Sequence, residues 1–192
     1  MGSGAGQPAY PILPEWQEKF TISGCGFNLN PLPDGQTMID CMILGDEVAD
    51  AIRQFRPECV LKTQANTTTE RWIRDNGVKF AAKTVIISLG TYDAPSQSLD
   101  NEALAVLAKL RAGIKADQVF WLLPTRAEPA DAMRALAQLY KDHLMVIEEK
   151  QRNLIHPTER GAEMLARESK RQGKADWTRH SWPKQTPTLV PG

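Results

Sequence analysis

The chain has 192 residues, 42% of them hydrophobic and 24% charged, a composition that suits one globular domain with a core of its own. Lysine plus arginine and aspartate plus glutamate number 23 each, so the net charge gives no reason to expect nucleic acid or an anionic membrane as a partner. No apolar run is long enough to span a bilayer, and residues 1–9 lack the basic and apolar regions of a secretory signal. We therefore expect neither secretion through a cleavable signal nor insertion into a membrane.

The chain begins with a segment, residues 1–36, whose many prolines and glycines oppose regular secondary structure. This segment also contains more apolar and aromatic side chains than a solvated linker needs. They are Tyr10, Ile12, Leu13, Trp16, Phe20 and Phe27. We predict an extended arm that covers these side chains either on its own domain or on a neighbouring subunit.

Residues 37–171 alternate short apolar runs with amphipathic stretches, the pattern of alternating strands and helices. Strands are predicted at 38–44, 59–62, 84–89, 119–123 and 144–147. Helices are predicted at 48–55, 68–75, 99–114, 128–141 and 158–171, with Thr158 as the N-cap of the last. This alternation implies right-handed crossovers, so we expect an α/β fold, a three-layer α/β/α sandwich around five parallel strands.

Three cysteines, Cys25, Cys41 and Cys59, are present, and the last two lie in apolar runs of strand character. A thiol in such a run usually serves as a small buried hydrophobe, so the sequence predicts free thiols rather than a structural disulfide. Cysteine and histidine do not have the spacing of a zinc site, and we expect neither a metal nor a cofactor.

Residues 172–192 form a basic tail that contains prolines, Trp177 and Trp182. Aromatic residues among basic ones can bind single-stranded nucleic acid by stacking and charge. We favour the simpler interpretation, in which the tryptophans pack on the parent domain or on an adjacent subunit.

Polar residues follow directly on three of the predicted strands: Glu47, Asn66, and the pair Tyr92 and Asp93. In a parallel α/β sheet the ligand-binding crevice lies beyond the carboxyl ends of the strands. We therefore expect these side chains to meet at one edge of the sheet.

Four stretches of the chain, in order, resemble the catalytic loops of the SGNH (GDSL-type) hydrolases. They are Gly-Asp-Glu at 45–47, Ala-Asn-Thr-Thr at 65–68, Gly-Thr-Tyr-Asp at 90–93 and Asn-Leu-Ile-His-Pro-Thr at 153–158. In that family the first reads Gly-Asp-Ser, the second centres on glycine, the third reads Gly-x-Asn-Asp and the fourth Asp-x-x-His. The resemblance covers residues 37–170 and implies a flavodoxin-like sandwich of the SGNH type.

The chemistry of that family needs a serine nucleophile, a histidine base oriented by a carboxylate, and an oxyanion hole whose donors include a glycine N–H and an asparagine side chain. The resemblance implies a degenerate triad here, with Glu47 for the serine, Asn153 for the carboxylate and His156 for the histidine. It also implies a crevice, able to bind a ligand, that is lined by Asp46, Asn66, Tyr92 and Asp93. A simpler interpretation of the first and last stretches is a helix N-cap at Asp46 and a turn at 156–158.

A carboxylate at position 47 has no proton for His156 to remove, and its attack on an ester would give an anhydride, so serine-type acyl transfer is not expected. We interpret the chain as a catalytically inactive SGNH-like domain that serves as a structural or interaction module in a larger assembly. Its partners are other protein subunits, contacted through the arm and the tail. Because SGNH-like domains occur in bacteriophage virions, the resemblance favours a virion structural or decoration protein, located in the cytoplasm or the virion.

The alternatives use the same crevice. One is an active acyl or carbohydrate esterase with Ser88, Thr91 or Ser96 as its nucleophile. Another is a hydrolase in which Glu47 and His156 act as an acid/base pair on water. A third is a protein that binds carbohydrate without turning it over.

Overall fold

The computed structural model describes residues 39–93, 102–125, 127–151 and 155–171. The predicted arm at 1–36 and tail at 172–192 lie outside the described residues, as do Ser96 and Asn153. Strands of the described chain are β1 (Ile39–Gly45), β2 (Val60–Thr63), β3 (Phe80–Ser88), β4 (Ile114–Lys115), β5 (Gln118–Leu123) and β6 (His143–Val146). Its helices are α2 (Val48–Phe55), α3 (Thr69–Asn76), α4 (Glu102–Gly113), α5 (Ala127–Tyr140) and α6 (Glu159–Glu168).

The five main strands form a parallel sheet in the order β2-β1-β3-β5-β6, which confirms the predicted α/β class and strand number. The sequence missed β4, because its two residues, which pair with the start of β3, are too few to show a pattern. It also placed the start of β3 too late. The first part of β3 alternates, with Phe80 and Ala82 buried and Lys83 exposed, whereas only its second part is a continuous apolar run.

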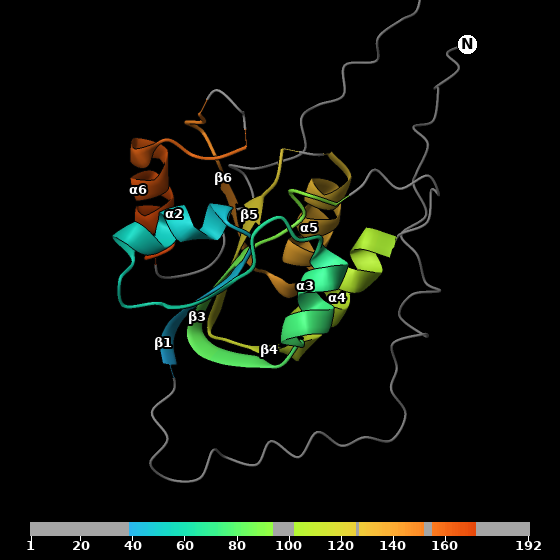
Figure 1. Cartoon of the computed structure of the whole chain (residues 1–192). Coiled ribbons are helices and arrows are strands. Elements are labelled where there is room, and N and C mark those ends of the chain that lie inside the picture. Colours follow the sequence, from blue (N-terminus) through green and yellow to red (C-terminus); the bar gives the residue numbers. More distant parts are fainter. Residues whose placement is uncertain (1–38, 94–101, 126, 152–154, 172–192) are drawn as a thin grey trace, which may run out of the picture. The chain divides into compact units, whose positions relative to one another are not determined.

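Helices cover both faces of the sheet, so the chain has the three predicted layers (Figure 1). Helices α2 and α6 pack on one face, and α3, α4 and α5 pack on the other. The side chains of successive residues in a strand point to opposite faces of the sheet. On β5, Phe120 contributes to the core under α2 and α6, and the next residue, Trp121, contributes to the core under the other helices.

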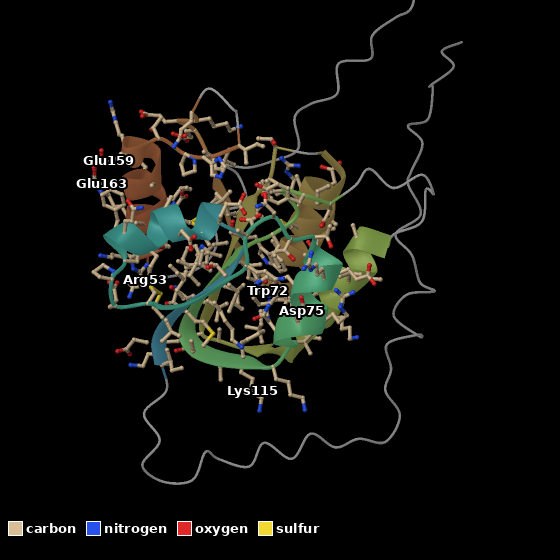
Figure 2. All side chains as sticks on the ribbon, viewed as in Figure 1. Arg53, Trp72, Asp75, Lys115, Glu159 and Glu163 are labelled. Atoms are coloured by element: carbon tan, nitrogen blue, oxygen red, sulfur yellow. A yellow bond between two sulfur atoms is a disulfide. The ribbon has the colours of Figure 1, made fainter. Side chains whose placement is uncertain are left out.

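The buried face of α3 is anchored by Trp72, which is fully buried between the helix and the sheet, whereas Asp75 of the same helix is exposed (Figure 2). Burying one large apolar side chain contributes roughly 1.5–3 kcal/mol, so a few such residues hold each helix on the sheet. Helix α6 begins as predicted, with the Thr158 hydroxyl accepting a hydrogen bond from the Gly161 amide at 3.1 Å. None of the helices in the described ranges is long and apolar enough to cross a membrane.

Cys41 of β1 and Cys59, which precedes β2, form a disulfide, so the prediction of free thiols at these two positions is wrong. The strand register pairs Met42 with Val60, and each cysteine immediately precedes one member of that pair, so the two lie side by side. Their Cα atoms are 4.4 Å apart, at the short end of the range that a disulfide spans. The sequence shows that each cysteine is in an apolar run, but the pairing depends on the register between two strands.

The chain order reverses between β1 and β3. After β1 the chain passes through α2 to the edge strand β2, and it then returns through α3 to β3 on the other side of β1. The loops that follow β1 and β3 therefore leave toward opposite faces of the sheet. Such a switch point is where open α/β sheets bind their ligands, and it lies beside the residues that follow Gly45 and Ser88.

Candidate functional site

The candidate site begins at Gly45, where the backbone of β1 lies close to the end of β3. This residue has φ +151°, and a Cβ built on it would lie 1.8 Å from the Ser88 carbonyl oxygen. Only glycine fits, and the Asp46 amide then donates to that same oxygen at 2.8 Å. The close contact fixes Asp46 and Glu47 beside the end of β3.

Asp46 is fully buried and connects the two strand ends to α2. Its Oδ1 accepts a hydrogen bond from the Val48 amide at 3.1 Å and another from the Ser88 hydroxyl at 3.0 Å. The simpler interpretation of this stretch places the helix N-cap at Asp46, one residue too early, because the cap of α2 is Glu47, whose side chain makes no cap hydrogen bond. Burial raises the pKa of Asp46 to about 6, although hydrogen bonds from Thr91, Ser88 and Val48 oppose the shift.

The carboxylate of Glu47 lies at the centre of the site. Its Oε2 accepts a hydrogen bond from the backbone amide of Asn66 at 3.0 Å, and its Oε1 accepts one from the Tyr92 hydroxyl. His156 Nε2 lies 3.7 Å from the same Oε1, a distance for an ion pair when the imidazole is protonated. We refer to Glu47, Asn66, Tyr92 and His156 as the Glu47 cluster.

The Glu47 cluster combines residues from four separate segments, at the carboxyl edge where the sequence places them. Asn66 belongs to the β2–α3 loop, Tyr92 follows β3, and His156 precedes α6. The side chains of Glu47 and His156 are 20% and 29% exposed, so solvent reaches the cluster. The cluster is thus an accessible group of polar side chains at the switch point of the sheet.

The Asn66 amide points at Glu47 because the residue adopts a left-handed backbone conformation, with φ +51°. Few residues other than glycine adopt this conformation, and asparagine is among those that do so most readily. The loop is fixed further by the Gln64 amide, which donates to the Gly45 carbonyl at 2.9 Å.

Asp93, which the sequence places in the crevice, bonds to the start of α3. Its Oδ1 accepts from the Thr69 amide and its Oδ2 from the Thr69 hydroxyl, both at 2.7 Å. These bonds tie the segment that carries Tyr92 to the first residue of α3. Asp93 therefore acts as a positioning residue for Tyr92, and its partner Thr69 was not identified from the sequence.

The alternative nucleophiles have different positions. Ser88 is 2% exposed and its hydroxyl donates to Asp46, so its hydroxyl is buried away from solvent. Thr91 is half-buried, and its hydroxyl lies close enough to Asp46 to lower the pKa of that carboxyl. Among the described residues, no group of three or more His, Cys, Asp or Glu could hold a metal ion.

No family model matches the sequence, and no curated protein matches it. The chain is structurally similar to a protein described as a GDSL-like lipase from Bacteroides ovatus, with a TM-score of 0.46 and 14% identity over 69% of this chain and 96% of that one. It is also similar to the C-terminal catalytic domain of peptidoglycan O-acetyltransferase A from Streptococcus pneumoniae, solved with a methylsulfonyl adduct. That alignment has a TM-score of 0.41 and 15% identity over 69% of this chain and 90% of the other. Both similarities concern the fold.

The raised pKa of Asp46 predicts a pH dependence of stability. The folded protein binds a proton at this carboxyl more tightly than the unfolded chain, because the pKa rises from 3.8 to about 6 on folding. Ionisation of Asp46 therefore lowers the free energy of unfolding as the pH rises from about 4 to about 6, by up to about 3 kcal/mol. Below about pH 4 this loss is absent.

The matched variant is Asp46→Asn, which does not titrate. We expect the free energy of unfolding of Asp46→Asn, minus that of the native protein, to increase by about 3 kcal/mol between about pH 4 and pH 7. Urea denaturation at several pH values measures this difference. A difference that stays constant or decreases over this range would show that burial does not raise the pKa of Asp46.

Proposed function

We propose that this chain is a non-catalytic SGNH-hydrolase-like domain that serves as a structural or interaction module in a larger protein assembly. The assembly that we propose is a bacteriophage virion, in which the chain would be a structural or decoration protein. One observation carries the non-catalytic part of this proposal, namely that the Glu47 carboxylate accepts hydrogen bonds from Asn66 and Tyr92.

The proposal follows from the chemistry of that carboxylate. In an SGNH hydrolase the position of Glu47 would hold a serine, and the positions of Asn66 and Tyr92 would hold donors to a developing oxyanion. Here both donors bond to Glu47, and His156 faces a carboxylate oxygen instead of a hydroxyl that it could deprotonate. At the position of Glu47 an acyl group therefore has no hydroxyl to accept it, and the two donors from Asn66 and Tyr92 are already bonded to the carboxylate.

A second candidate function rests on the distance of 3.7 Å between His156 and Glu47. A carboxylate and an imidazole at this separation can act as an acid/base pair on a water molecule. This hydrolase would turn over esters without a serine, and its rate would depend on His156. A third candidate, carbohydrate binding without turnover, would use the same hydrogen-bonding groups.

The arm and the tail supply the proposed contacts with other subunits. Tryptophans such as Trp16, Trp177 and Trp182 are typical anchors at protein interfaces, because a large rigid side chain loses little entropy on binding. The described residues form two buried apolar clusters, one on each face of the sheet. Deleting 1–36 or 172–192 should therefore leave a folded α/β domain that no longer joins its assembly.

Circular dichroism and thermal unfolding measure whether each truncated protein folds, and sedimentation with particles from the native source measures whether it assembles. The control is the full chain with Glu47→Gln, which alters the crevice and should assemble normally. The proposal would be contradicted if both truncated proteins assembled while Glu47→Gln or Tyr92→Phe did not, because the crevice would then be the interface.

A further inference from the structure

We infer that Asn66, Tyr92 and His156 of the Glu47 cluster form a binding site for a carboxylate group, and that the occupant of this site in the native chain is the carboxylate of Glu47 itself. Each oxygen of the Glu47 carboxylate accepts a hydrogen bond from a different donor. The Asn66 amide donates to Oε2 and the Tyr92 hydroxyl donates to Oε1. His156 Nε2 adds a third polar group 3.7 Å from Oε1. Hydrogen bonds to an ionised acceptor are about twice as strong as those between neutral groups, so this arrangement favours a carboxylate over a neutral ligand.

We expect the site to form without Glu47, because the backbone segment that carries each of the three facing groups is held by other residues. The Asn66 loop is held by the bond from the Gln64 amide to the Gly45 carbonyl. The segment of Tyr92 is held by the two bonds between Asp93 and Thr69.

The segment of His156 is held in the same way. The Gln151 amide donates to the His156 carbonyl at 2.8 Å, and the Gln151 side chain donates to the Pro157 carbonyl at 3.0 Å. Removing the Glu47 side chain should therefore leave a pocket whose donors stay in place. Such a pocket can take up a carboxylate from solution.

The size of the vacated space identifies the ligand class. The substitution Glu47→Ala removes one methylene and the carboxylate, and these are the heavy atoms of acetate. A small monocarboxylate thus replaces what the substitution takes away. The negative charge of Asp46 beside the pocket weakens the attraction for any anion, so selection depends on the directed hydrogen bonds more than on net charge. This inference does not depend on the proposed role in an assembly.

The test measures thermal unfolding of the full-length Glu47→Ala protein against acetate concentration at pH 7, with sodium chloride keeping the ionic strength constant. We expect a saturable rise in Tm of about 2–4 °C at an acetate concentration about five times Kd. The native protein should show no saturable rise, because Glu47 fills its site. A second substitution, Tyr92→Phe in the Glu47→Ala background, should weaken acetate binding about tenfold or more, since it removes a donor to a charged group.

The matched control is Glu163→Ala on α6 (Figure 2), where the same side chain is lost from an exposed ion pair with Arg167. The Tm of Glu163→Ala should rise no more in acetate than in sodium chloride at the same ionic strength. The inference would be overturned if Glu47→Ala gave no saturable response, or if Glu163→Ala or the native protein gave the same one. Should Glu47→Ala fail to fold, Glu47→Ser also removes the carboxylate, leaves only a hydroxyl at the γ position, and has the same expected result. Failure of both to fold would also contradict the inference, because a pocket built by other segments does not need Glu47.

Discussion

Replacing Asp142 with alanine should lower the free energy of unfolding by about 3–5 kcal/mol, the cost of breaking a buried ion pair from one side. Arg111 of α4 donates to both oxygens of Asp142, at 2.6 and 2.7 Å, and the side chains of the pair are only 12% and 4% exposed. The indole N–H of Trp121, which is fully buried, donates to the same carboxylate at 3.0 Å. Removing the carboxylate would leave a largely buried guanidinium and a buried indole N–H without this acceptor.

Asp131→Ala is the matched control for this prediction. Asp131 pairs with Arg134 at 2.7 Å on α5, but its side chain is 45% exposed, and exposed ion pairs contribute about 1 kcal/mol or less. Urea denaturation of both variants and the native protein measures the two losses. Losses of equal size would show that burial does not make the Asp142 interaction stronger.

Much of the fold could be predicted because the pattern of apolar residues reports it directly. Runs such as 119–123 are buried on both faces, and this identifies strands of a parallel sheet between helices. The sequence could not show features that depend on pairing between distant residues. The Cys41–Cys59 disulfide requires the register of β1 against β2, and the Asp142–Arg111 pair requires α4 to lie beside the α5–β6 turn.

In the candidate site too, the positions of the residues could be predicted from sequence but their hydrogen bonds could not. The positions of Glu47, Asn66 and Tyr92 at one edge follow from the order of strands and loops, which can be inferred from sequence. The bonds of each side chain do not follow from that order. They depend on the left-handed backbone of Asn66 and on the contact of Asp93 with Thr69, and both are details of loops.

The central claim is that a carboxylate at position 47 prevents acyl transfer. An assay of ester hydrolysis tests this claim most directly. The assay compares the native protein with His156→Ala on para-nitrophenyl acetate and on acetylated sugars. We predict no turnover by the native protein above that of His156→Ala, because no hydroxyl at position 47 exists for the imidazole to activate. A native rate that falls by about 100-fold or more in His156→Ala would contradict the account, since that is the contribution of a working general base.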